Sequence, residues 1–141
     1  MISNFFKKTS ARLVFLTLSI ALLAAEDHAI HHTFVNLSSS IIKISSDNGD
    51  FDSTLRPGSY LGGIKRASEK NKKRTFSVSN LSKAEVYTFT DTAETFGLGQ
   101  VRLNIHEHGQ PKSLAVEHKV SYPNDNQTHH VVILTDPKNG Y

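Results

Sequence analysis

The stretches Gln100–His108 (QVRLNIHEH) and Leu114–Val120 (LAVEHKV) repeat their apolar residues with a period of two: Val101, Leu103 and Ile105 share one face of the first, and Leu114, Val116 and Val120 share one face of the second. An alternation with a period of two predicts a β-strand that buries one face and exposes the other. His118 lies on the apolar face of its stretch, so we expect it to point into the core. His106 and His108 lie on the polar face, so we expect them to point towards solvent.

The segment between these stretches contains Gly109 and Pro111, which favour a turn. We therefore expect a hairpin that pairs the two strands antiparallel. Period-two segments rich in β-branched residues recur along the chain, separated by short turn signals. The other segments expected to form strands are 31–37, 40–46, 55–63, 75–79, 84–90 and 128–135.

About seven or eight strands and no amphipathic helix define the expected fold class. The sequence predicts an all-β fold, namely a single small antiparallel β-sandwich of immunoglobulin-like or related type. A small β-barrel is the alternative arrangement of the same strands.

The first 25 residues have the three parts of a signal peptide. Three basic residues precede the apolar run Leu13–Ala25, and small residues end that run. Thirteen residues span about 20 Å as a helix, less than the roughly 30 Å of a membrane hydrocarbon core. We predict a cleavable signal peptide over 1–25, a single domain over 26–141, and no transmembrane segment after cleavage. Cleavage after Ala29 is the alternative, and either site predicts an exported protein, periplasmic or extracellular.

Charge and cysteine content exclude several function classes. Three of the 16 basic residues lie in the predicted signal peptide, which leaves 13 against 13 acidic residues and a mature net charge of zero. Overall basicity therefore does not indicate nucleic-acid binding. The absence of cysteine excludes disulfides, thiol catalysis and thiolate metal sites. No nucleophile elbow, zinc-protease helix or phosphate loop occurs, so we expect no enzymatic activity.

Histidine is abundant, with eight residues in the chain. His106 and His108 are two residues apart on an expected strand, so their side chains point the same way with Cα atoms about 7 Å apart. Such a pair chelates Zn²⁺ or Cu²⁺ when further ligands converge on it. The candidates for these ligands are Glu117, His129 and His130.

A second metal hypothesis concerns the new N-terminus. Cleavage after Ala25 places His28 third, and cleavage after Ala29 leaves Ile-His31-His32, with a histidine again in third position. A free amine, two deprotonated amides and a third-position imidazole form a square-planar set that suits Cu²⁺ or Ni²⁺.

The segment 65–74 carries six positive charges and only one negative charge. We expect a polar, basic loop there that contacts an anionic partner, such as a protein, a glycan or a charged surface. Nucleic acid is not the expected partner, because the loop lacks the aromatic residues of a stacking platform. The basic residues are Lys65, Arg66, Lys70, Lys72, Lys73 and Arg74.

These features together predict an exported, non-enzymatic binding protein with an unknown partner. A periplasmic or secreted copper- or zinc-binding protein that uses its surface histidines is the alternative. No cofactor is expected beyond copper or zinc in that alternative.

Overall fold

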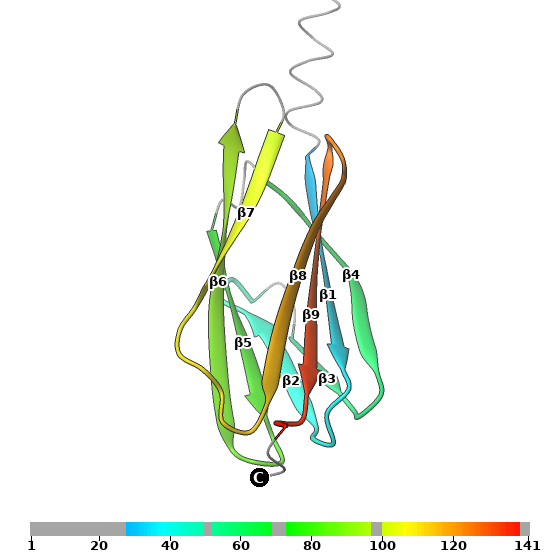
Figure 1. Ribbon diagram of the computed structural model, residues 1–141, viewed down its shortest axis with the longest axis vertical. Helices are drawn as coiled ribbons and strands as arrows, with labels where there is room; N and C mark the ends of the chain where they lie inside the picture. Colours follow the sequence, from blue (N-terminus) through cyan, green and yellow to red (C-terminus); the bar gives the residue numbers. More distant parts are fainter. Residues whose placement is uncertain (1–27, 50–51, 69–72, 97–99, 139–141) are drawn as a thin grey trace, which may run out of the picture.

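The computed structural model describes residues 28–49, 52–68, 73–96 and 100–138 (Figure 1). The predicted signal peptide and the bond after Ala25 lie outside these residues, whereas the bond after Ala29 lies within the first strand, and cleavage at either site remains a prediction. Within the described ranges the regular elements are all strands, and these residues therefore contain no helix that could cross a membrane. The strands are β1 (Ala29–Asn36), β2 (Ile42–Ser46), β3 (Asp52–Leu55), β4 (Tyr60–Ala67), β5 (Lys73–Asn80), β6 (Glu85–Phe96), β7 (Gln100–Glu107), β8 (Ala115–Asn124) and β9 (Gln127–Thr135).

The strands form two sheets that pack face to face (Figure 1). The first sheet has the order β4-β1-β9-β8, and the second has the order β3-β2-β5-β6-β7. All neighbours are antiparallel except β1 and β9, which run parallel. The prediction of a small all-β sandwich is confirmed, and the sheets do not close into a barrel.

The predicted hairpin between the stretches 100–108 and 114–120 is wrong. β7 pairs with β6 and β8 pairs with β9, so the chain crosses from the second sheet to the first between them. The carboxylate of Glu85 accepts hydrogen bonds from the backbone N–H groups of Lys112 and Ser113 at 3.0 and 2.9 Å, which holds this crossing. Alternation specifies a buried face for each strand but not its neighbour, and both arrangements bury the same faces.

Inward side chains form two apolar clusters with a polar layer between them. The first cluster contains Phe34, Phe76 and Phe89, whose ring centroids lie 5.2 to 6.3 Å apart. The second contains Ile30 and Leu103 and lies nearer the other end of the sandwich. Burying each such side chain contributes about 1.5–3 kcal/mol to stability. Because inward positions recur at every second residue, β1 and β6 each place one polar residue between the two clusters, His32 between Ile30 and Phe34 and Asp91 between Phe89 and Ala93.

Candidate functional site

The polar layer consists of six inward-facing side chains from six strands. Each of them lies on the face of its strand that points into the sandwich. On β1, for example, His32 lies on the same face as Ile30 and Phe34. Buried polar groups are costly unless they are paired, so such a layer needs a complete set of partners. Its members are His32 on β1, Arg66 on β4, Arg74 on β5, Asp91 on β6, His118 on β8 and His130 on β9.

Three of these residues, His32, His130 and His118, form a continuous line of hydrogen bonds that we call the histidine chain. Nδ1 of His32 lies 3.0 Å from Nδ1 of His130. Nε2 of His130 lies 2.9 Å from Nδ1 of His118. At the inner end, Nε of Arg66 donates to Nε2 of His32 at 3.1 Å. The side chains of His32 and His130 are fully buried, and that of His118 is 11% exposed.

The outer end of the histidine chain meets a tyrosine and a glutamate. The hydroxyl of Tyr87 donates to Oε1 of Glu107 at 2.7 Å. Nε2 of His118 lies 3.0 Å from the same hydroxyl and 3.2 Å from the same carboxylate oxygen. The Glu107 side chain is 27% exposed, so the chain of contacts leads from the core to the surface.

The two ends impose the same direction on every hydrogen bond of the histidine chain. Arg66 only donates, so Nε2 of His32 accepts and the proton of this neutral ring is on Nδ1. His130 then accepts at Nδ1 and donates from Nε2, and His118 accepts at Nδ1 and donates from Nε2. This last donation matches Tyr87, whose own proton goes to the glutamate. Three neutral histidines therefore satisfy all six ring nitrogens without conflict.

Burial is the main cause of the perturbed protonation in this layer. It lowers the pKa of His32 to about 2, with further lowering by His130 and the two arginines, and lowers the pKa of His130 to about 3. Burial also raises the pKa of Asp91 to about 6, against the opposing pull of Arg66 and Arg74. These shifts keep both histidines neutral at physiological pH.

Asp91 is the only carboxylate in the layer, and its two oxygens differ. Oδ1 forms an ion pair with Nη2 of Arg66. Oδ2 lies 3.4 Å from Nε2 of His32 and makes no hydrogen bond within the part of the chain that the structure describes. Leaving a buried oxygen without a hydrogen bond costs about 1–3 kcal/mol. A proton on Oδ2 would make this oxygen a hydrogen-bond donor and so reduce that cost.

His32, Asp91 and His130 also bring one ligand atom each within 4.8 Å of one another, which is the donor set of a metal site. Their surroundings oppose a metal ion. Both ring nitrogens of each histidine are already hydrogen-bonded, and the guanidinium groups of Arg66 and Arg74 add positive charge beside them. His32, Asp91 and His130 are therefore better suited to exchanging protons than to coordinating a divalent cation.

The remaining candidate ligands form two pairs outside the core, in which His31 is half-buried and the other three rings are exposed. The rings of His106 and His108 meet edge to face at 4.9 Å, and both side chains point to solvent as predicted. His31 and His129 lie side by side on the outer face of β1 and β9 with centroids 5.3 Å apart. Within the described residues, no third ligand from Glu117 or elsewhere joins either pair.

The contacts of His28 bear on the N-terminal copper hypothesis. This buried ring donates from Nδ1 to the carbonyl of Asp125 at 3.0 Å and accepts at Nε2 from Thr128 at 2.9 Å. Nδ1 is the nitrogen that closes a chelate with the residue's own amide, so copper would have to break the first contact. After cleavage at Ala29, copper would have to displace His32 from the core and the start of β1 from its neighbours.

The predicted basic loop over 65–74 is wrong at both ends, because β4 continues to Ala67 and β5 begins at Lys73. Arginine is tolerated inside the sandwich here because a buried carboxylate, that of Asp91, compensates its charge. Arg66 and Arg74 are buried in the polar layer, Lys65 and Lys73 are exposed, and Lys70 and Lys72 lie outside the described residues.

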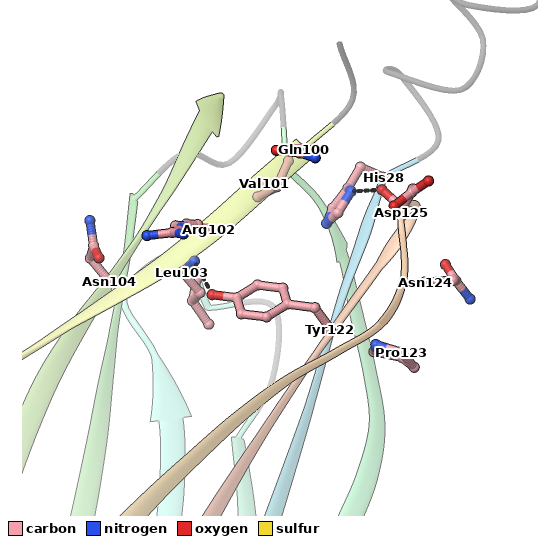
Figure 2. A pocket seen from close by; sticks show the side chains of 10 residues that line it. All are labelled: His28, Gln100, Val101, Arg102, Leu103, Asn104, Tyr122, Pro123, Asn124 and Asp125. Atoms are coloured by element: carbon pink, nitrogen blue, oxygen red, sulfur yellow. Dashed lines mark hydrogen bonds between the residues drawn. The ribbon is translucent and has the colours of Figure 1, made fainter. Parts of the chain in front are cut away.

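β7 and β8 are edge strands of opposite sheets, and a groove runs between them. Two hollows, which we call the upper and the lower hollow, lie along this groove. The upper hollow has a volume of about 630 Å³ and is shown in Figure 2. Tyr122 reaches across it from β8, and its hydroxyl accepts a hydrogen bond from the backbone N–H of Leu103 on β7 at 3.0 Å (Figure 2). The lower hollow, of about 620 Å³, is lined by Glu107 and His118 and thus meets the histidine chain.

No protein-family model and no curated protein matches this chain. The polar layer and the groove are the features of the described residues that bear on function. Sequence reasoning missed both, although a signal for the polar layer was present. Asp91 lies two residues from Phe89 and from Ala93, and Arg74 lies two residues from Phe76. Each charged residue therefore falls on the face of its strand that otherwise carries apolar side chains.

Proposed function

We propose that this chain is an exported, non-enzymatic binding protein that binds an oligosaccharide in the groove between β7 and β8. The observation that supports this proposal is the upper hollow. Its volume lies within the range of about 300–1,000 Å³ that is common for small-ligand sites.

The lining of the upper hollow suits a polar ligand without net charge. The side chains of Gln100, Asn104 and Asn124 supply amide donors and acceptors, and Arg102 is balanced by Asp125. Tyr122 is 48% exposed and offers an aromatic face against which a sugar ring can pack. Hydroxyl-rich sugars match this combination of planar polar groups and one exposed ring.

The groove has better support than the basic segment as a binding surface. Burial of Arg66 and Arg74 removes two of the six charges on which the anionic-partner hypothesis rested. The proposed absence of catalysis is supported by His28 and His118, two of the histidines that line the hollows, whose ring nitrogens are all engaged within the protein. Export rests on the sequence features of residues 1–25.

Nuclear magnetic resonance (NMR) titration of the purified protein with oligosaccharides of glucose, N-acetylglucosamine and galactose tests the proposal. We expect amide shifts along β7 and β8, and about tenfold weaker binding for Arg102→Ala and Asn104→Ala, since each removes hydrogen bonds to the ligand. Arg56→Ala, in the exposed turn after β3, is the matched control and should bind like the wild type. Shifts confined to other strands, or no shifts with any of these sugars, would contradict the proposal.

A copper- or zinc-binding protein is the second candidate function. The observation that favours it is the pairing of half-buried His31 with exposed His129 on the outer face of the sheet, in addition to the exposed pairing of His106 with His108. Elemental analysis of protein purified from its native compartment tests it. Near-stoichiometric metal that is lost when one pair is changed to alanine would support this candidate, and metal-free protein without Cu²⁺ or Zn²⁺ uptake would reject it.

A further inference from the structure

The histidine chain connects two carboxylates that differ completely in their access to water. Asp91 is fully buried, whereas Glu107 lines the lower hollow of the groove. Every contact between them is a hydrogen bond or a close approach of 2.9 to 3.4 Å between groups that can exchange a proton.

We propose that the histidine chain relays a proton between Asp91 and Glu107, so that external acidity sets the charge of the buried Asp91–Arg66 ion pair. This role goes beyond ligand binding in the groove and does not depend on it.

The relay is balanced when it is written as a series of proton transfers. When Nε of Arg66 releases its hydrogen bond to Nε2 of His32, a proton on Oδ2 of Asp91 passes to this nitrogen, and His32 releases its Nδ1 proton to Nδ1 of His130. His130 then releases its Nε2 proton to Nδ1 of His118, which releases its own Nε2 proton to Glu107. Each step breaks one O–H or N–H bond and forms one on the next atom, with no redox change. The reverse sequence carries a proton inwards.

The hydrogen-bond directions favour the outward transfer as the first event. In the resting tautomers each histidine already donates towards the groove, and Oδ2 of Asp91 faces the accepting nitrogen of His32. The outward transfer leaves the opposite tautomers, which Arg66 and Tyr87 disfavour, and an inward transfer starts from these tautomers and restores the resting ones. The resting hydrogen bonds are therefore already arranged for proton release from Asp91.

Aromatic packing shields the path from water. The ring of Phe76 lies 4.8 Å from that of His32, and the ring of Phe89 lies 4.7 Å from that of His118. Bulk water therefore has no direct access to the inner contacts, and protons reach Asp91 through the histidines. The charged and titratable groups that act on the relay are Arg66 on β4, Arg74 on β5, Tyr87 on β6, Glu107 on β7, His31 on β1 and Asp47 beside β2.

The charge of Asp91 has a structural consequence because its ion pair joins the two sheets. Arg66 belongs to β4 in the first sheet, and Asp91 belongs to β6 in the second. Protonation of Asp91 removes the charge from one side of this link. The relay therefore makes the contact between the sheets responsive to acid.

The first test measures the tautomers directly. Full-length protein labelled with ¹⁵N-histidine is examined by NMR at pH 7. We expect the proton on Nδ1 of His32 and on Nε2 of His130 and His118, with His28 (Nδ1–H) as an internal reference outside the chain. An opposite tautomer or a charged ring at any of the three positions would overturn the relay, and this measurement needs no variant.

The second test separates a relay from a merely structural network. After a rapid pH change, the carboxyl stretch of Asp91 is followed by infrared spectroscopy and identified by its loss in Asp91→Asn. His118→Gln keeps a hydrogen-bonding side chain that cannot relay protons, so the response should slow about tenfold or more as it becomes limited by local opening. Lys119→Gln, which is exposed on β8 next to His118, should keep the wild-type rate. A wild-type rate in His118→Gln would overturn the proposal.

Discussion

Two histidine doublets on neighbouring strands present the same residue type to opposite environments. The parallel register of β1 and β9 pairs His31 with His129 and His32 with His130. The first pair lies on the outer face of the sheet, and the second pair is sealed in the core. We call them the outer pair and the inner pair.

The comparison shows that the side of the strand decides the chemistry of these residues. Burial is the largest cause of the lowered pKa of both His31 and His32, but it is far stronger for His32, whose pKa falls to about 2. For His31 the pKa is lowered by slight burial, by His129 and by Lys65. A displacement of one residue along the strand thus converts a solvated ring into a member of the histidine chain.

The largest expected effect comes from breaking the environment of the inner pair. Asp91→Ala leaves Arg66 buried without its carboxylate and should lower the free energy of unfolding by about 4 kcal/mol. Asp52→Ala removes an exposed ion pair with Lys43 and should change it by less than about 1 kcal/mol. Urea denaturation measures both, and equal effects would show that the polar layer does not stabilise the core.

Removal of one ring from each pair gives the next largest difference. His130→Ala creates a cavity and leaves His32 and His118 without partners, so it should cost about 3 kcal/mol. His129→Ala, one residue away on the outer face, should stay within about 0.5 kcal/mol of the wild type. Thermal and urea unfolding check this difference, and a larger loss for His129→Ala would reverse the assignment of sides.

Acidification distinguishes the pairs through linkage. The inner histidines titrate near 6.5 when unfolded and near 2 and 3 when folded, so the stability from keeping them neutral is present above pH 6.5 and lost below it. Asp91 acts oppositely, because its raised pKa gives a contribution that is present at low pH and lost as pH rises through about 6. The effect of the two histidines is larger than that of Asp91. We therefore expect the free energy of unfolding to fall by about 2 kcal/mol when the pH is lowered from 7 to 5.

Urea titrations across this pH range measure the loss. His32→Phe with His130→Phe should flatten the pH dependence, since phenylalanine does not titrate. His31→Ala with His129→Ala should leave it largely unchanged. Stability that stays constant or rises from pH 7 to pH 5 in the wild type would contradict neutral, buried histidines.

The smallest expected effect concerns the outer pair alone. Lys65 pairs with His31 across β4 and β1, and its charge lowers the pKa of that histidine. Lys65→Gln should therefore raise the pKa of His31, as measured by NMR titration. Lys73→Gln, at an exposed position on β5, is the matched control and should leave this pKa unchanged. A fall in the pKa of His31 in Lys65→Gln would contradict the pairing.

Much of the fold could be predicted because alternation is visible along the chain. It correctly indicated an all-β sandwich, the inward direction of His118 and the outward direction of His106 and His108. The candidate site could not be predicted to the same extent. The histidines were recognised as unusual and interpreted as metal ligands, whereas the structure brings three of them together with Asp91 and Arg66.

The amino-acid sequence by itself determined which residues face inwards, because a side chain's face depends only on the local period of the backbone. It also determined the absence of disulfides. Only the tertiary structure decided which strands are neighbours, that β7 and β8 enclose a groove, and that His32 meets His130 across 98 residues of chain. Such contacts depend on long-range packing and on the pairing of buried polar groups, which no local pattern encodes.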